Sequence, residues 1–267
     1  MAFIGGLLFI VSIFLFFFRR SQLARLACIR LARPCTTEQI RQTADGVAEE
    51  IGGGSWQDYV KVQGEIQCDQ PLRSQLKKVD CVHYTCKVTR KYEEITTKKD
   101  SNGNRVKETE QKSEVISRDT QSTPFWLVDA TGKIEVYPDG VDDVETVEVL
   151  SEFKRESQAS GGKLSFGKFS ISLPRQTSQG PGRTIGYQYE ESILPIGRDA
   201  LVIGMATDAT SKPTLRKPTE GKNKFIISLK AETELAKAAK TKAQRAFYGM
   251  LATSGTGSAL IAVSLFQ

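Results

Sequence analysis

The hydrophobic positions of this chain are spread unevenly, and the first of two long uncharged runs lies at its start. Residues 2–18 carry no charge, and Ser12 is the one hydroxyl among them. A run of this length is at the short end of what spans the hydrocarbon core of a bilayer. Arg19 and Arg20 follow the run, whereas a cleaved signal peptide has positive charge before its apolar stretch and small residues at a cleavage site after it. We therefore predict a retained transmembrane helix over residues 2–18, with a signal peptide as the alternative.

A second uncharged run, residues 246–266, lies at the other end and is rich in Gly, Ser and Thr. Small residues are common in membrane helices because they let two backbones approach closely. Gly249, Thr253 and Gly257 are spaced to share one helix face, which predicts a helix-packing surface for the first helix or for another subunit, as in a homo-oligomer. We predict a second transmembrane helix over residues 246–266. The alternative is a weakly hydrophobic helix buried in a soluble domain.

Basic residues adjoin both runs, on the side that faces the middle of the chain. They are Arg19, Arg20, Arg25, Arg30 and Arg33 after the first run, and Lys237, Lys240, Lys242 and Arg245 before the second. The positive-inside rule then predicts an integral membrane protein whose middle is cytoplasmic and whose two short termini lie on the opposite face. Contacts of these residues with anionic headgroups at the membrane surface account for much of the net charge of +6. The charge pattern has no basic stripe with interleaved aromatic residues, so we expect no nucleic-acid partner.

The segments next to the two runs are predicted to be helical. Residues 19–54 are a basic juxtamembrane segment that contains a helix, because residues 36–39 fit a capping box and the triple glycine 52–54 ends the helical period that follows. Residues 231–245 are rich in Ala, Glu and Lys, with acidic residues first and basic residues last, as the helix dipole favours. This second juxtamembrane helix is expected to run directly into the second span.

Residues 55–230 show the alternation of polar and apolar positions that is typical of strands. The clearest example runs from Val82 to Tyr92. Asn102-Gly103 predicts the turn of an exposed, charged hairpin, and the Ser, Gly and Pro of residues 158–182 predict a loop with a short ordered piece at about residues 166–173. Further strands are expected at residues 59–68, 125–128, 134–136, 144–149, 187–194, 200–207 and 225–229. With about eight to ten strands, the fold class is mainly β, a barrel- or sandwich-like α+β domain inserted between two transmembrane helices.

Candidate chemistry is sparse. Cys81, His83 and Cys86 have the composition of a zinc site, but alternation along a strand puts Cys81 and His83 on one face and Cys86 on the other, and no second cysteine pair completes a tetrahedron. Cys86 is predicted to be a core residue and His83, the single histidine, a cross-strand surface residue. A cytoplasmic domain keeps its cysteines reduced. We predict no catalytic residue, no cofactor and no metal site.

Sequence blocks in the β segment occur in a familiar order. They are Cys81-Val-His-Tyr84 running to Arg90-Lys-Tyr-Glu-Glu94, then Pro124-Phe-Trp-Leu-Val-Asp129 with Gly132-Lys-Ile-Glu-Val136, then Gly186-Tyr-Gln-Tyr-Glu-Glu-Ser-Ile-Leu-Pro195 with Gly197 and Val202-Ile-Gly204, and last Phe225-Ile-Ile-Ser228. In this order the chain resembles the GIDE, or BAM ("beside a membrane"), family over about residues 56–245. The resemblance implies a domain set between two membrane helices, as in E3 ubiquitin ligases of mitochondrial and chloroplast outer envelopes. Residues 49–56 and the arginines before them are similar to prokaryotic, especially cyanobacterial, members.

The same blocks predict which residues support the fold. Apolar residues expected in the core are Tyr84, Val88, Phe125, Leu127, Ile134, Val136, Tyr187, Ile193, Ile203 and Ile227. Turns, bulges or close approaches are expected at Gly132, Gly186, Gly197 and Gly204. Asp129 is predicted to cap the turn at 130–132, and Glu190 or Glu191 to pair with Arg183.

The resemblance also sets an expectation for function. The ligases of this family carry a RING finger after the second helix, whose cysteines and histidine hold two zinc ions and recruit the ubiquitin-loaded E2. This sequence ends at Gln267 without such a ligand series, so we expect a RING-less member. The favoured function is a non-enzymatic, membrane-anchored module that binds a protein partner or organises the membrane surface. Two alternatives stay open: a component of an E3 ligase whose RING lies on another chain or beyond a truncated end, and a lipid- or small-molecule-binding barrel.

Overall fold

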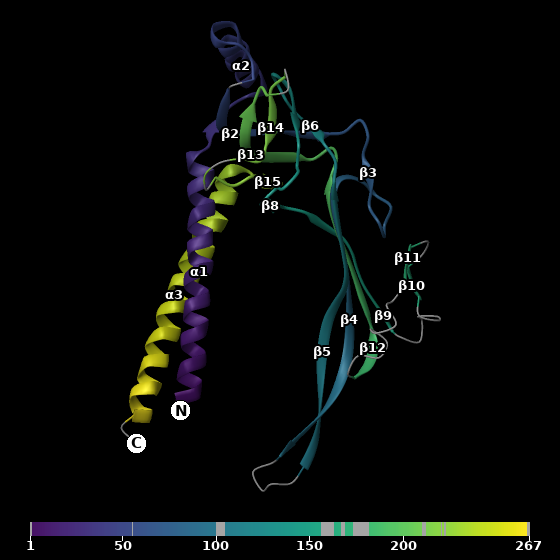
Figure 1. Ribbon diagram of the computed structural model, residues 1–267, viewed down its shortest axis with the longest axis vertical. Helices are drawn as coiled ribbons and strands as arrows, with labels where there is room; N and C mark the ends of the chain where they lie inside the picture. The colour runs from purple at the N-terminus through teal and green to yellow at the C-terminus, as the bar shows by residue number, and fades with distance from the viewer. Residues whose placement is uncertain are drawn as a thin grey trace. The chain divides into compact units, whose positions relative to one another are not determined.

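The computed structural model divides the chain into two compact units (Figure 1). It describes residues 2–54, 56–99, 105–155, 163–166, 169–172, 182–209, 212–219, 221 and 223–265. The first unit comprises Met1–Glu65, Leu127–Val144 and Asp199–Gln267, and the second comprises Ile66–Trp126 and Glu145–Arg198. The β segment between the two ends of the chain therefore contributes strands to both units.

Two long antiparallel helices of the first unit lie side by side, α1 (Ala2–Leu31) and α3 (Glu232–Leu265) (Figure 1). As predicted, α3 is continuous from the juxtamembrane segment into the uncharged run. The helical segment Phe3–Leu31 of α1 is long and apolar enough to cross a membrane. The described residues of α3 do not reach the combination of length and hydropathy required of a membrane span. Helix length and hydropathy thus support a span for α1, and the prediction of two spans is not confirmed by them.

The helix α2 (Thr37–Ile51) begins and ends where the sequence predicts. The Gln39 backbone N–H donates to Thr36 Oγ1 over 3.3 Å, and the Thr36 N–H donates to Gln39 Oε1 over 3.1 Å, which completes the capping box. At the other end the Gly52 N–H donates to the Ala48 carbonyl, and Gly52 has a φ of 87° that favours glycine.

Asp129 attaches the start of α2 to a strand turn. Its carboxylate accepts hydrogen bonds from the Thr37 N–H over 2.8 Å, from the Thr131 N–H over 2.7 Å and from the Gly132 N–H over 3.0 Å. Burial by itself raises the pKa of this carboxyl, but the hydrogen bonds from Thr131 and Thr37 outweigh burial and hold the pKa below its ordinary value. The predicted role of Asp129 as the cap of the 130–132 turn is confirmed.

The sheet of the first unit closes on itself. In order across the sheet, its strands are β1 (Arg33–Pro34), β2 (Gln57–Gln67), β6 (Phe125–Asp129), β7 (Gly132–Val136), β14 (Thr214–Arg216), β13 (Asp199–Thr207), β15 (Ile226–Ser228) and β8 (Asp143–Val144). Because β2 also pairs with β13, from Gln57↔Thr207 to Glu65↔Asp199, the strands β2, β6, β7, β14 and β13 form a closed five-stranded barrel. The predicted mainly β, barrel-like class is confirmed for this unit.

The two faces of β13 have different neighbours. Leu201 and Ile203 pack on the outside of the barrel with residues of α1, β15 and α3, a buried cluster of Ile29, Ala32, Ile226 and Leu235. Val202 points the opposite way and is fully buried, next to its register partner Val62 on β2. The barrel interior is therefore apolar, and the outer face holds the ends of the two long helices.

The second unit is an open antiparallel sheet built around one long strand. This strand, β4 (Asp80–Lys99), pairs with β12 (Arg183–Pro195), with β5 (Arg105–Ser122) and with the short β3 (Leu72–Arg73), while β9 (Val147–Arg155) pairs with the far side of β12. β10 (Lys163–Phe166) and β11 (Phe169–Ser172) form a separate hairpin inside the segment predicted to be a loop. The predicted charged hairpin is confirmed by pairing of β4 with β5 as far as Lys99↔Arg105, and its Asn102-Gly103 turn lies outside the described residues.

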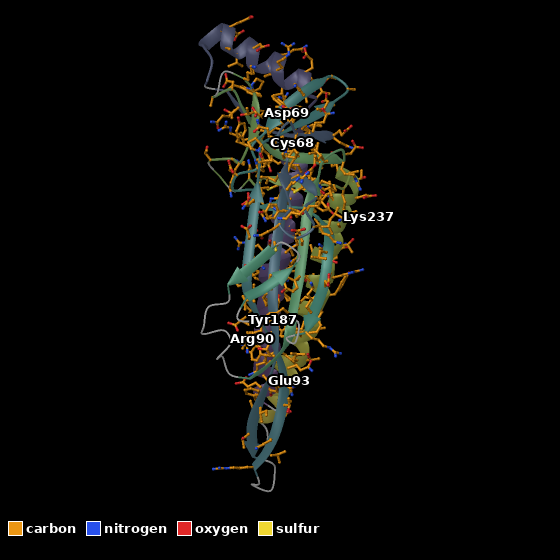
Figure 2. All side chains as sticks on the ribbon, turned by 90° about the vertical axis from the view of Figure 1, so that its right-hand side faces the viewer. Cys68, Asp69, Arg90, Glu93, Tyr187 and Lys237 are labelled. Carbon is orange, nitrogen blue, oxygen red and sulfur yellow. The ribbon has the colours of Figure 1, made fainter. Side chains whose placement is uncertain are left out.

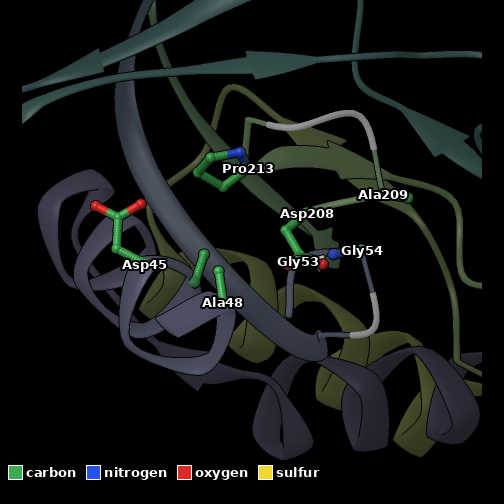
Figure 3. A pocket seen from close by; sticks show the side chains of 8 residues that line it. Asp45, Ala48, Gly53, Gly54, Asp208, Ala209 and Pro213 are labelled. Carbon is green, nitrogen blue, oxygen red and sulfur yellow. Dashed lines mark hydrogen bonds between the residues drawn. The ribbon is translucent and has the colours of Figure 1, made fainter. Parts of the chain in front are cut away.

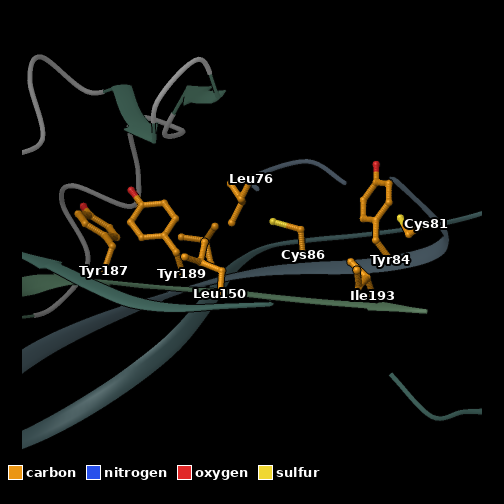
Figure 4. Packing of buried hydrophobic residues seen from close by; sticks show 9 residues of the cluster. Leu76, Cys81, Tyr84, Cys86, Leu150, Tyr187, Tyr189 and Ile193 are labelled. Atoms are coloured by element: carbon orange, nitrogen blue, oxygen red, sulfur yellow. The ribbon is translucent and has the colours of Figure 1, made fainter. Parts of the chain in front are cut away.

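One face of this sheet carries a cluster of buried side chains (Figure 4). Its members are Leu76, Cys81, Tyr84, Cys86, Val88, Leu150, Tyr187, Tyr189 and Ile193. Cys86 is thus in the core, as predicted, but Cys81 lies on the same face and not on the opposite one. The reason is a register shift, because Cys81 pairs with Pro195 while His83 pairs with Leu194. His83 is cross-strand, with Nδ1 2.7 Å from Ser122 Oγ, but it is 7% exposed, so its prediction as a surface residue is wrong.

Two charged side chains are buried in the second unit. Glu191 is 0% exposed and accepts hydrogen bonds from Ser74 Oγ, the Leu76 N–H and the Lys77 N–H over 2.9, 2.6 and 2.8 Å. Its neighbour Glu190 forms an ion pair with Lys87 over 2.7 Å. The predicted pairing of either glutamate with Arg183 is therefore wrong.

The second buried charge is Arg90, next to its cross-strand partner Tyr187 (Figure 2). Its Nε donates to Thr184 Oγ1 over 2.8 Å, and its guanidinium lies 4.7 Å from the centre of the Tyr92 ring. Both buried charges of this unit are held by polar or aromatic neighbours, as burial of a charge requires.

All ten predicted core residues are buried. The close approaches predicted for Gly186 and Gly204 are confirmed, since an added Cβ would lie 2.3 Å from the Lys154 carbonyl oxygen and 2.8 Å from the Phe225 ring. The single strand predicted for residues 144–149 is wrong. It is divided between β8, which pairs with β15, and β9, which pairs with β12, because the chain passes from the first unit to the second between these strands.

Candidate membrane-facing helix pair

α1 and α3 meet along a narrow seam. On α1 the least exposed side chains recur every three or four residues: Gly5, Leu8, Ser12, Leu15, Arg19, Gln22, Leu26 and Ile29. On α3 they are Leu235, Ala239, Ala243, Ala246, Met250, Thr253 and Gly257. The stripes face each other, since Ser12 Oγ donates to the Met250 carbonyl over 3.4 Å. Such spacing is typical of two helices packed at a small crossing angle.

The seam brings glycines of α3 against both small and large residues of α1. A Cβ added to Gly257 would lie 3.2 Å from the Gly5 carbonyl oxygen and 3.4 Å from Leu8 Cβ. A Cβ added to Gly249 would lie 3.2 Å from Leu15 Cδ1. Of the three residues predicted to pack helices, Gly249 and Gly257 thus lie against α1, while the Thr253 hydroxyl donates to the Gly249 carbonyl of its own helix over 2.9 Å.

The rest of the apolar part of α1 is uncovered within the described residues. Phe3, Ile10 and Phe14 expose 84%, 69% and 68% of their surface, and 11% of the most apolar window of the helix is buried. A core helix of a water-soluble domain buries such side chains. A large continuous apolar patch on a protein surface marks contact with a partner or a membrane.

The charged ends of the apolar runs lie level with each other. The Arg19 guanidinium lies 4.7 Å from the centre of the Phe247 ring, so the last turn of one run lies beside the first turn of the other. Arg20, Lys237, Lys242 and Arg245 are exposed, and Figure 2 shows Lys237 on α3. Among the described residues no carboxylate forms an ion pair with these four, or with Arg19, Arg30 or Lys240.

Two of the predicted membrane-surface residues instead form ion pairs with strands of the first unit. Arg25 Nη2 lies 2.8 Å from Asp143 Oδ2, and Arg33 forms an ion pair with Asp58. Arg25 and Arg33 therefore attach the end of α1 and the residues after it to these strands. The other seven basic residues are the ones whose charge is available to a surface or ligand.

Lys61 connects the two helices where they meet the barrel. Its side chain is 8% exposed, and Nζ donates to the Ile29 carbonyl over 3.1 Å and to Glu232 Oε1. The last carbonyls of a helix lack intrahelical donors, and a carboxylate in the first turn favours the positive end of a helix dipole. Lys61 thus supplies a donor to the end of α1 and a counter-charge to the first residue of α3. Sequence reasoning missed it, because a lysine between Val60 and Val62 on an alternating strand is typical of a solvent-facing position.

A pocket of about 420 Å³ separates α2 from the barrel (Figure 3). Asp208, one of its two acidic residues, accepts hydrogen bonds from the Gly54 N–H over 2.8 Å and from the Trp56 N–H over 3.0 Å. Asp45, the other, is exposed on α2. Asp208 thus holds the backbone after α2, and this pocket offers no pair of groups for acid–base chemistry.

The thiols have the properties of core or structural residues. All five cysteines are free. Burial raises the pKa of Cys81 to about 11 and that of Cys86 to about 12, so neither is a thiolate at neutral pH. Burial also lowers the pKa of His83. Among the described residues, no group of three His, Cys, Asp or Glu side chains could hold a metal ion.

Comparison with known families gives one match. A family model described as GIDE, E3 ubiquitin ligase, covers residues 93–262. The chain belongs to the GIDE family. The match begins within β4 and continues through most of α3, so it includes the helix whose hydropathy is modest. No curated protein and no solved structure matches the chain.

Proposed function

We propose that this chain is a membrane-anchored GIDE protein, in which α1 and α3 cross a bilayer as an antiparallel hairpin. The observation that carries the proposal is the exposure of Phe, Ile and Leu side chains around α1, on every side except the stripe that meets α3. Contact with lipid would remove this surface from water, at about 25 cal/mol for each Å².

The packing of α3 on α1 supports a second span. Gly257 lies beside Gly5, and Phe247 lies beside Arg19, so the two uncharged runs are in register along the whole pair. Small residues at such an interface are typical of membrane helices, where close packing rather than water exclusion drives association. The modest hydropathy of α3 comes from small residues in the seam, such as Gly257, together with exposed ones such as Gly255 and Thr256.

The charge distribution supports a cytoplasmic position for the barrel. The basic ends of both helices are the ends that pack on the barrel, and the uncharged ends lie together at the other extremity of the pair (Figure 1). By the positive-inside rule the basic ends face the cytoplasm and both termini face the opposite side.

The role we assign to the anchored protein is non-enzymatic: it binds a protein partner or organises the membrane surface. The carboxylates that lie inside or at the edge of the two units support this role, because the buried Asp208 and Glu191 and the partly buried Asp129 are each engaged by backbone N–H groups. Val62 and Val202 face the barrel interior and are 1% and 0% exposed, so neighbouring side chains fill the space around them, which disfavours a ligand-binding barrel.

Extraction of membranes tests the anchor. Washing at high pH releases peripheral proteins and leaves bilayer-spanning ones in the pellet. The full chain should stay in the pellet until detergent is added. Recovery of the chain in the wash would contradict the proposal.

Reporter fusions test the number of spans and their direction. A reporter inserted between Asn102 and Gly103 should be cytoplasmic, and reporters at either terminus should lie on the opposite face. A C-terminal reporter on the same side as the hairpin reporter would leave α1 as the single span and contradict the role of α3. A hairpin reporter on the outside would contradict the orientation.

The family description favours a second candidate, a component of ubiquitin ligation. The two candidates differ in a direct assay. The purified chain should not accelerate discharge of ubiquitin from a charged E2, whereas cross-linking in membranes should recover a specific protein partner. Accelerated discharge by the chain alone would overturn the non-enzymatic role.

A further inference from the structure

A groove of about 480 Å³ lies between α1 and α3, next to the apolar runs. Three cationic side chains line it, Arg19 and Arg30 from α1 and Lys240 from α3, together with Leu23, Phe247 and Tyr248. This volume is within the range of small-molecule sites. The residues come from both helices, so the groove exists because the helices pair.

The three cations of the groove lack counter-charges in the described part of the chain. Two nearby arginines behave differently, since Arg25 of α1 and Arg33 of β1 have Asp143 and Asp58 as partners. An anion placed in the groove would be attracted by these cations. Arg19 is also oriented by the Phe247 ring, at 4.7 Å from its centre.

The apolar members of the groove indicate what kind of anion fits. Leu23 and Tyr248 are 42% and 68% exposed, and Tyr248 lies at the start of the uncharged run of α3. A tyrosine beside basic residues at this level is typical of the membrane interface, where an aromatic ring meets headgroups and acyl chains together. A free phosphate ion would use the cations and leave these apolar side chains in water.

We infer that this groove binds the phosphate headgroup of an anionic phospholipid, with the acyl chains lying along the apolar runs of α1 and α3. The inference rests on the proposed membrane anchor. It differs from a general attraction to an anionic surface, because the site is formed by three particular cations on one side of the helix pair.

A charge-matched pair of variants tests the site in the full chain. The groove variant is Arg19→Gln, Arg30→Gln and Lys240→Gln, and the control variant is Arg20→Gln, Lys237→Gln and Lys242→Gln, which removes equal charge from exposed positions. Each protein is reconstituted in phosphatidylcholine vesicles with and without phosphatidylglycerol and then extracted with mild detergent. Mass spectrometry measures the phosphatidylglycerol that stays bound to each chain, and circular dichroism checks that the helix content is unchanged.

The unaltered chain and the control variant should retain phosphatidylglycerol in preference to phosphatidylcholine, and the groove variant should retain at least about tenfold less, as loss of more than one favourable charge contact implies. Equal losses in both variants would overturn the inference in favour of surface electrostatics. Displacement of the lipid by millimolar inorganic phosphate would overturn it in favour of a free-anion site. A chain that stays in the bilayer at high pH but retains no phosphatidylglycerol would overturn the site alone, whereas release at high pH would overturn the anchor.

Discussion

α1 and α3 pack along a common seam, yet their side chains are distributed in opposite ways. α1 directs Phe and Ile side chains away from the seam, so its apolar character is visible as a window of high hydropathy in its sequence. α3 places Ala and Gly in the seam and exposes further small residues such as Gly255 and Thr256 away from it, so its hydropathy is lower. The comparison teaches that hydropathy measures the apolar character of one helix taken alone. A paired membrane helix also needs small residues that contact its partner.

The strongest way to break this asymmetry is to put a large side chain on the small side of the seam. Gly257→Leu should lower the free energy of unfolding by about 2–3 kcal/mol, since even its Cβ meets the Gly5 carbonyl and Leu8. Thermal unfolding of the detergent-solubilised chain, followed by circular dichroism, measures the loss. Gly255→Leu is the matched control, because nothing lies within 4 Å of a Cβ there. Equal destabilisation by both substitutions would mean that α1 does not pack on this face of α3.

The contacts of Lys61 with the end of α1 and the start of α3 provide the next test. Lys61→Met should cost about 1–2 kcal/mol, because Glu232 and the Ile29 carbonyl both lose their donor. Denaturant unfolding measures the change, with Lys237→Met as a control at an exposed position of α3. If Lys61 acts through Glu232, the addition of Glu232→Gln to Lys61→Met should cost less than the sum of the two single changes. Strict additivity would show that the pair is not coupled.

A smaller effect on stability should distinguish Arg25, which forms an ion pair with Asp143, from Arg20, which forms none with a described residue. Arg25→Gln should cost about 1 kcal/mol or less, because it breaks a partly exposed ion pair with Asp143. Arg20→Gln should leave stability unchanged. The same unfolding measurements compare the two variants. A larger loss of stability for Arg20→Gln than for Arg25→Gln would contradict the structural role of Arg25.

The smallest expected effect is on the stability of α2 at acidic pH. The pKa of Asp129 is depressed in the folded chain, so this carboxyl stabilises α2 fully above its ordinary pKa of 3.8 and progressively less as the pH falls through the lower folded value. Hydrogen exchange below about pH 4 should therefore show earlier opening of α2 than of the α1–α3 seam, whose contacts are mostly uncharged. Asp129→Asn removes the ionisable group, so α2 should open early at neutral pH as well and its opening should lose most of its dependence on pH. Simultaneous opening of both regions in the unaltered chain would contradict this prediction.

Local signals in the sequence were sufficient for several elements. The capping box and the triple glycine define α2, and the alternation from Val82 to Tyr92 defines the middle of β4. β1, β3 and β14 could not be predicted in the same way, because two or three residues are too few to show a period. The position of Cys81 was also beyond reach, since the register shift that moves it to the face of Cys86 depends on β12, far away in the sequence.

The candidate site shows the same division. The basic residues at the ends of the uncharged runs were evident from charge alone, but their division into bound and free groups needs the partner strands that carry Asp143 and Asp58. Lys61 and the groove around Arg19 were not predictable, because burial of a lysine and proximity of two chain ends are properties of the assembled unit.

By itself the sequence determined the apolar surface of α1, the charges that border both runs, the ends of α2 and most of the core, because each depends on residues that are neighbours along the chain. The tertiary structure alone decided that β2 meets β13 to close a barrel, and that Gly257 meets Leu8. It also decided that Lys61 joins the end of α1 to the start of α3. Those contacts join segments that are far apart in sequence, and their free energy exists only once the segments have been brought together.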